Sequence, residues 1–246
     1  MLAVRSQPIR PRAVPVAVEE AGAALARGEP VLLFDAPDRE GETDLVILSE
    51  LATPELIRLL RRDAGGVLFT AISAELREAI GLPFQSEMLE IAEERFPTLR
   101  GLRKENLRYD KRSSFGVSVN HRSTFTGVTD NDRARTVRAM GELARAAPLL
   151  DRSALRLRFE GEFSSPGHVP LLYAAPGLLA ERKGHTELTV SLARMTGLSE
   201  CVTGCEMLGD SGGARSPEAA ARYASEHGWR FLDGESLREA WVRWSE

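Results

Sequence analysis

The sequence predicts a mixed β-sheet covered by helices on both faces. Short, wholly apolar runs typical of buried strands alternate along the chain with stretches whose apolar spacing is typical of helices. This alternation forms no regular strand–helix–strand repeat, and we find no glycine-rich phosphate loop, so a doubly wound sheet fits less well. The 246 residues suffice for one large domain or two small ones. Because no Pro- or Ser-rich linker divides them, we expect residues 1–15 to be an irregular leader and residues 16–246 to form a single domain.

Four strands and their covering helices are expected before residue 147. A helix that begins at Val16 ends at Gly28, because glycine commonly closes helices. Thr53 and Pro54 open the next helix, since Thr caps a helix and Pro is tolerated in its first turn. The expected strands cover 31–34, 45–48, 67–72 and 115–119, and the expected helices cover 16–28, 53–63, 74–80 and 131–146.

The second part of the chain is expected to add three strands and three helices. The strands cover 169–174, 202–208 and 229–232, and the helices cover 185–195, 216–227 and 235–244. Residues 85–112 show no clear pattern. Their basic part, 100–112, is interpreted as a solvated loop or a segment that faces a second subunit.

Charge and composition argue against several classes of protein. The net charge of −4 and the isoelectric point near 5.7 weigh against a nucleic-acid partner, since nucleic-acid binders are usually basic. The first twelve residues lack the apolar core of a signal peptide, and no apolar run is long enough to span a membrane. We therefore expect no membrane partner and a cytoplasmic protein. Cys201 and Cys205 are interpreted as reduced core residues, because no second cysteine pair completes a zinc site.

An acidic loop between two apolar runs is the most informative segment. Residues 38–44 read Asp-Arg-Glu-Gly-Glu-Thr-Asp and hold four carboxylates, which repel one another unless a cation lies among them. Oxygen ligands of this kind suit hard cations such as Mg²⁺. Gly41 lets the backbone bend so that the carboxylates can converge. A solvated acidic turn would have the same composition, but the flanking buried strands favour a site held on a rigid scaffold.

Two of the four histidines stand in contexts that suit chemistry. His168 follows Pro166 and Gly167, so it is expected at a turn before an apolar strand, where it could act as a general acid or base or be purely structural. His185 lies where a turn enters a helix, and helix starts favour anions. Arg182, Lys183 and Thr186 add positive charge and a hydroxyl donor there, a combination that suits a phosphate.

Glu206 is a carboxylate in an otherwise apolar strand-like run. Such a group is costly unless it is paired, hydrated or near a metal, and its pKa is often raised, which suits proton transfer. A buried ion-pair partner is the alternative. His121 and His227 receive no role.

Taken together, these segments resemble one family, the 3,4-dihydroxy-2-butanone 4-phosphate synthases of riboflavin biosynthesis. The resemblance rests on order and spacing over residues 16–245, because each motif alone is weak. It is most like the archaeal-type single-domain branch, so we expect no second domain of the cyclohydrolase kind. The segments concerned are 38–44, 63–66, 125–133, 166–169, 182–187 and 205–206.

The resemblance implies an α+β fold, a three-layer α/β/α sandwich with a mixed β-sheet. It implies a lyase that converts D-ribulose 5-phosphate into L-3,4-dihydroxy-2-butanone 4-phosphate and formate with Mg²⁺, or Mn²⁺, in a homodimer with active sites at the interface. Glu40 and His185 would bind the metal, and His168 and Glu206 would be the catalytic pair. Substrate contacts would come from Arg39, Glu40, Glu42, Asp44, Arg182, Lys183, Gly184, His185, Thr186 and Glu206, with Thr126 reaching in from the neighbouring subunit.

The chain departs from the family pattern at four positions. Phe69 stands where many members have cysteine, Ser164 and Ser165 stand near an expected arginine, and Tyr173 replaces another arginine. Two further hypotheses therefore stay open. One is a related metal-dependent sugar-phosphate lyase or isomerase of altered substrate. The other is a non-catalytic relative that acts as a binding protein.

Overall fold

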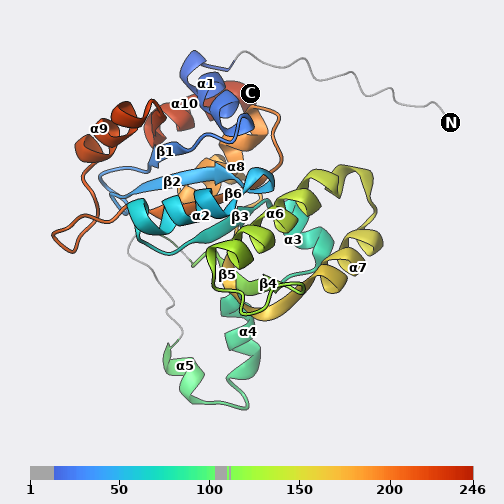
Figure 1. Cartoon of the computed structure of the whole chain (residues 1–246). Helices are drawn as coiled ribbons and strands as arrows, with labels where there is room; N and C mark the ends of the chain where they lie inside the picture. Colours follow the sequence, from blue (N-terminus) through green and yellow to red (C-terminus); the bar gives the residue numbers. More distant parts are fainter. Residues whose placement is uncertain (1–13, 103–109, 111, 246) are drawn as a thin grey trace.

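One mixed sheet of seven strands forms the middle layer of the protein (Figure 1). The structure is a computed structural model, and it describes residues 14–102, 110 and 112–245. The strand order is β4-β5-β3-β6-β2-β1-β7, where only β3/β5 and β1/β7 are parallel neighbours. The strands are β1 Val31–Phe34, β2 Thr43–Leu48, β3 Phe69–Ile72, β4 Phe115–His121, β5 Phe163–Tyr173, β6 Cys201–Glu206 and β7 Arg230–Asp233.

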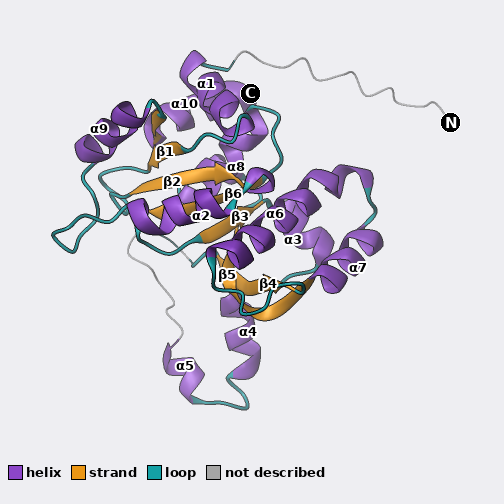
Figure 2. Ribbon diagram, in the orientation of Figure 1, coloured by secondary structure: helices purple, strands orange, loops and turns teal. Residues whose placement is uncertain are grey.

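Helices cover both faces of this sheet (Figure 2). The first covering layer is α1 Val16–Ala26, α8 His185–Met195 and α10 Gly234–Ser245. The opposite face carries α2 Pro54–Leu59, α6 Asp130–Ala146 and α9 Pro217–His227, with α3 Ala74–Ile80 and α7 Arg152–Glu162 beside the β4–β5 end. The predicted three-layer sandwich with a mixed sheet is therefore confirmed.

Alternation of side chains along the strands explains why both faces need helices. In β1, Leu33 packs towards α1 and α8, whereas Leu32 packs towards the α2 and α9 side. In β2, Val46 and Leu45 divide in the same way. All four side chains are fully buried. Strands of this kind contain no polar face, which is why they could be read from the sequence as unbroken apolar runs.

Several sequence-based boundaries were wrong. The interpretation of residues 100–112 as a solvated loop fails at its start, because α5 extends over Thr98–Leu102, and α4 over Gln85–Ala92 precedes it. Residues 103–109 and 111 lie outside the described part of the chain, as does most of the expected leader. The helix α7 was not predicted at all; only Leu155 of its eleven residues is buried, so its apolar stripe is thin.

The expected turn at His168 is also wrong. Residues 166–168 lie inside the long strand β5, which contains a cis Ser165–Pro166 peptide bond. Proline and glycine indicated a turn, but here they form an irregularity within a ladder: Asn120 pairs with Ser164 while Val119 pairs with Val169. Residues 165–168 thus bulge from the β4–β5 pairing.

The helix expected over 53–63 instead ends as a π-helical turn, Leu60–Ala64, before Gly65. Among the described residues, no helix is long and apolar enough to cross a membrane.

Candidate active site and metal centre

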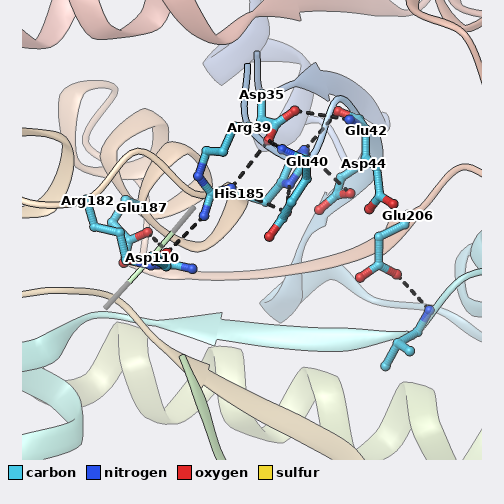
Figure 3. Close-up of polar contacts among 11 residues, drawn as sticks. Asp35, Arg39, Glu40, Glu42, Asp44, Asp110, Arg182, His185, Glu187 and Glu206 are labelled. Atoms are coloured by element: carbon cyan, nitrogen blue, oxygen red, sulfur yellow. Dashed lines mark hydrogen bonds and ion pairs between the residues drawn. The ribbon is translucent and has the colours of Figure 1, made fainter. Parts of the chain in front are cut away.

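The acidic loop joins β1 to β2, and the Asp35 carboxylate closes it. Its two oxygens accept the backbone N–H groups of Glu40 and Glu42, each at 3.0 Å, and the Asp35 side chain is fully buried. Gly41 adopts a φ of 68°, which provides the sharp bend expected from the sequence. The loop therefore directs the side chains of Glu40 and Glu42 to one side (Figure 3).

The first turn of α8 brings His185 against this loop. Its Nδ1 lies 3.3 Å from a Glu40 carboxylate oxygen, its Nε2 lies 3.1 Å from the Glu42 carbonyl oxygen, and Nε2 is 3.6 Å from Asp44 Oδ1. Both ring nitrogens thus face oxygen atoms, an arrangement that suits either an imidazolium ion or a nitrogen bound to a cation.

Two guanidinium groups flank the acidic cluster on the α8 side. Arg39 pairs with Asp35, Glu40 and Asp110, and Arg182 pairs with Asp110 and Glu187. The Asp110 carboxylate thus lies between the two arginines (Figure 3).

Gly184 makes this arrangement of guanidinium groups possible. A Cβ at that position would lie 2.3 Å from an Arg182 nitrogen and 2.8 Å from an Arg39 nitrogen. It also precedes the first turn of α8, whose N–H groups lack intrahelical acceptors and favour an anion.

Glu206 enters the site because β6 pairs with β2. Asp44 and Glu206 are directly opposite each other in the antiparallel register, so their side chains share one face of the sheet. The Glu206 carboxylate accepts the backbone N–H of Val67 at 2.7 Å, and the Glu206 carbonyl accepts that of Gly66. The segment after the π-helical turn therefore holds Glu206 from its second side (Figure 3).

Electrostatics of the cluster favour bound protons or a cation. Burial raises the pKa of Asp44 to about 8, although His185 opposes the rise and the neighbouring glutamates add to it. Burial would lower the pKa of His185, but the Asp44 charge and the Glu40 hydrogen bond together raise it to about 9. Burial would raise the pKa of Glu40, yet the His185 hydrogen bond and the Arg39 charge hold it at about 2.

The donor set fits a hard divalent cation. One ligand atom each from Asp35, Glu40 and His185 lies within 4.8 Å of the others. Next to them, both oxygens of the buried Asp44 carboxylate accept no hydrogen bond. A buried, unpartnered carboxylate is costly unless it is protonated or faces a cation. Two carboxylates and an imidazole with a third carboxylate alongside are ligands that magnesium or manganese accepts.

Of these groups, Glu40, Asp44 and His185 line a cavity of about 110 Å³. Its wall comprises Glu40, Asp44, Phe69, Ser113, Ser114, Phe115, Leu172, Arg182, His185, Thr186 and Glu206. Two larger hollows, of about 1050 and 680 Å³, lie elsewhere on the protein. Among the described residues, Asp35, Glu40 and His185 are the one group of three side chains close enough to share a metal ion, and none of them lines either hollow.

Phe69, one of the departures from the family pattern, forms part of the cavity wall. Its ring fits because residue 204 is glycine: a Cβ there would lie 2.8 Å from the ring.

The other departures lie outside the cavity wall. The Tyr173 ring packs on Gly116, and its hydroxyl accepts the Val117 N–H. Ser164 donates to the Asn120 carbonyl. Lys183 is exposed and does not line the cavity.

His168 and Thr126 form a second group at the other end of the β4–β5 pair. His168 contacts Asn120, and Gly127, next to Thr126, packs against the same asparagine. Phe115 lines the cavity at the start of β4, five residues from Asn120, which corresponds to roughly 16 Å along a strand. His168 is not among the residues that line the cavity with Glu206. The registers of β3 with β5 and β6, continued by two or three residues, place His168 and Glu206 on either side of Val67, two strands apart.

Sequence reasoning missed three residues of these two groups. Asp35 stands at the end of a buried strand, and its position just before the loop was the available signal. Asp110 and Asn120 carry no such signal, because their partners Arg39 and His168 lie 71 and 48 residues away in the chain.

Comparison with known proteins identifies the family. The family model of 3,4-dihydroxy-2-butanone 4-phosphate synthase matches residues 19–240. The chain belongs to the 3,4-dihydroxy-2-butanone 4-phosphate synthase family.

The synthase of Methanothermobacter thermautotrophicus is 43% identical over 92% of this chain and 96% of its own length. That of Archaeoglobus fulgidus is also 43% identical, over 93% and 95% respectively. A crystal structure of a 3,4-dihydroxy-2-butanone 4-phosphate synthase in complex with two magnesium ions is 25% identical, with a TM-score of 0.69 over 89% of this chain and 94% of that one. The resemblance seen in the motifs is thus confirmed, and the family fold matches the sandwich described above.

Proposed function

We propose that this chain converts D-ribulose 5-phosphate into L-3,4-dihydroxy-2-butanone 4-phosphate and formate, and so serves riboflavin biosynthesis. The observation that carries the proposal is the cluster of Asp35, Glu40 and His185 at the N-terminal end of α8, beside the buried Asp44 carboxylate, which accepts no hydrogen bond. The family membership gives the reaction, and this cluster supplies the groups that the reaction requires.

Glu40 and His185 would hold the cation, which we propose to be Mg²⁺, with Mn²⁺ as the alternative. A bound divalent ion would supply Lewis-acid stabilisation of the negative charge that develops on substrate oxygens. Glu42 and Asp44 would complete the acidic side of the pocket. Without the cation, Asp44 with a pKa of about 8 and His185 with a pKa of about 9 hold protons at neutral pH, whereas Glu40 with a pKa of about 2 is ionised.

The substrate phosphate would lie at the start of α8. There Arg182, Gly184 and Thr186 offer a guanidinium and helix-terminal N–H groups, and Arg39 lies alongside. The exposed Lys183 side chain would add a positive charge that attracts the substrate phosphate. Glu206, held by the Val67 N–H, would move the carbon-bound proton as one member of the catalytic pair.

A homodimer would complete the site. Thr126 does not line the cavity of its own chain, so a second copy would have to deliver it. Phe125, next to Thr126, is 97% exposed, and Val128 is also exposed, as expected of side chains that a partner covers. Two free, buried cysteines agree with action in a reducing cytoplasm.

The test is formate release from ribulose 5-phosphate. We expect purified protein with Mg²⁺ to release formate, and EDTA to stop the release. Glu40→Gln keeps the shape of the side chain but removes its charge, so it should lower kcat/KM by roughly a hundredfold or more. Glu226→Gln, an exposed change on α9, is the matched control and should have no effect. Formate release that survives EDTA, or no formate at any metal concentration, contradicts the proposal.

Phe69 favours a second candidate, a related lyase or isomerase for a different sugar phosphate. Its ring takes up space in the wall of a small cavity. A panel of pentose phosphates, assayed for formate and for isomerisation, separates the two: turnover of another pentose phosphate with none of ribulose 5-phosphate supports the second.

A further inference from the structure

His168 sits where the β4–β5 ladder is irregular. Because residues 165–168 bulge from the pairing, the His168 backbone N–H does not bond to a strand carbonyl. It donates to the side-chain oxygen of Asn120, Oδ1, at 2.8 Å. The same asparagine also reaches the His168 ring, so one amide group contacts both the backbone and the imidazole.

The backbone contact fixes which way the Asn120 amide points. A backbone N–H can only donate, so the atom 2.8 Å from it must be the oxygen. The amide nitrogen Nδ2 is then left next to His168 Nδ1, at 3.1 Å, while Oδ1 is further from that ring nitrogen, at 3.3 Å. The nearer neighbour of Nδ1 is therefore a hydrogen-bond donor.

This neighbour decides the tautomer of the neutral ring. A neutral imidazole carries one N–H, and the other nitrogen accepts. A hydrogen on Nδ1 would point at the hydrogens of the Asn120 amide, whereas a bare Nδ1 accepts one of them. The hydrogen of the neutral His168 ring consequently belongs on Nε2.

Two glycines allow the neighbouring backbone to approach Asn120 closely. A Cβ on Gly127 would lie 2.2 Å from the Asn120 amide nitrogen, and a Cβ on Gly167 would lie 1.9 Å from the carbonyl carbon of Val119. Gly127 has a φ of 87°, which favours glycine on its own account. Both the β4–α6 loop and the bulge of β5 thus approach Asn120 more closely than any other residue type would allow.

We propose that Asn120 is a positioning residue that holds His168 as the neutral Nε2–H tautomer. The catalytic meaning of this rests on the proposed function. In this state His168 presents a hydrogen-bond donor at Nε2, so it polarises a substrate oxygen and does not accept a proton. Removal of the carbon-bound proton is left to Glu206. A neutral imidazole that acts as an electrophile is an established catalytic device.

The tautomer can be observed without turnover. We expect ¹⁵N NMR of histidine-labelled protein, at a pH where the ring is neutral, to show His168 with a bare Nδ1 and a protonated Nε2. The resonance is assigned by its loss in His168→Gln. Asn120→Asp has the same shape, but its carboxylate can only accept, so a proton should appear on Nδ1. Gln85→Glu adds the same charge at an exposed position on α4 and should leave the ring as in the wild type.

The kinetic measurement then tests the role. Asn120→Asp should lower kcat on the order of tenfold or more, with KM for ribulose 5-phosphate and the melting temperature little changed, and Gln85→Glu should retain wild-type kcat. A wild-type ring protonated on Nδ1, a tautomer indifferent to Asn120→Asp, or an altered tautomer with unchanged kcat overturns the inference. A wild-type protein with the Nε2–H ring but no formate release overturns the proposed function alone.

Discussion

Asp44 is the side chain whose surroundings are hardest to satisfy without a cation. Its carboxylate is buried, accepts no hydrogen bond, and lies near Glu40, Glu42 and Glu206. Its raised pKa, and that of His185, mean that the metal-free pocket keeps protons at neutral pH. A divalent cation must compete with those protons, because both bind to the same lone pairs.

We expect Mg²⁺ to bind more tightly as the pH rises through the neutral range towards about 9, with proton release on binding. Titration calorimetry in two buffers of different ionisation enthalpy measures both quantities. Asp44→Asn should reduce the number of protons released. A Mg²⁺ affinity that does not change with pH would contradict the raised pKa values of Asp44 and His185.

The same shifts set the sign of the stability change with pH. A proton held more tightly in the folded chain stabilises the fold only while it is bound. The His185 contribution is complete below its ordinary pKa of 6.5 and is lost as the pH rises through about 9. The Asp44 contribution declines in the same direction, from its ordinary 3.8 through about 8. Urea unfolding of EDTA-treated protein should therefore show a free energy of unfolding that falls between pH 6.5 and 9, and Mg²⁺ should offset the fall.

At the residue scale, the sequence predicted those parts of the site that lie in contiguous motifs. Glu40, Glu42 and Asp44 belong to one short sequence motif, and the residues around His185 begin helix α8. The structure places these two groups in contact, although their roles stay predictions. Asp110 and Asn120 could not be found in this way, because their importance comes only from contacts made across the fold.

At the scale of elements, the π-helical turn after α2 determines where Glu206 points. Gly65 takes a φ of 91° directly after that turn, and Gly66 then lies against Glu206. A Cβ on Gly66 would be 2.4 Å from the Glu206 carboxylate, whereas one on Gly65 would meet no atom within 4 Å.

Gly66→Ala should therefore displace the Glu206 carboxylate and lower kcat by at least about tenfold, with only a modest fall in melting temperature. Gly65→Ala is the matched control. It strains the backbone, so it should cost on the order of 1 kcal/mol of stability, yet it should leave kcat near that of the wild type. Equal kcat losses in the two variants would show that Glu206 does not depend on this turn. Steady-state kinetics with parallel thermal melts makes the comparison.

Elements were predicted well where burial is complete and poorly where it is partial. The buried strands β1 and β2 were recognised from apolar runs because both of their faces meet helices. The helix α7 escaped notice because most of its side chains face solvent. The β5 bulge was misread because Pro166 and Gly167 usually indicate a turn, and only the pairing with β4 shows that the strand continues.

At the scale of the whole molecule, mixing two variants distinguishes a His168 that acts in its own chain from a His168 that acts in the partner chain. If each active site uses the pocket of one chain and His168 of the other, two inactive variants should rescue each other. His168→Ala and Glu206→Gln, mixed and re-associated in equal amounts, should regain about a quarter of the wild-type sites, because half of the dimers are mixed and each of these has one intact site.

Each variant alone should stay inactive, and re-association of either variant with itself is the control. Formate release after mixing reports the rescue, and size-exclusion chromatography with light scattering reports the dimer. A mixture as inactive as its components would mean that both residues act within one chain.

The pocket has more carboxylates than guanidinium groups, and this affects the order in which the metal ion and the substrate would bind. Arg39 and Arg182 are already engaged by acidic partners from three separate segments. An incoming phosphate ester therefore meets net repulsion, not attraction, until a doubly charged ion has arrived. Occupancy would thus be ordered, with the inorganic ion first and the sugar ester second, and the affinity of each for the protein would depend on the other.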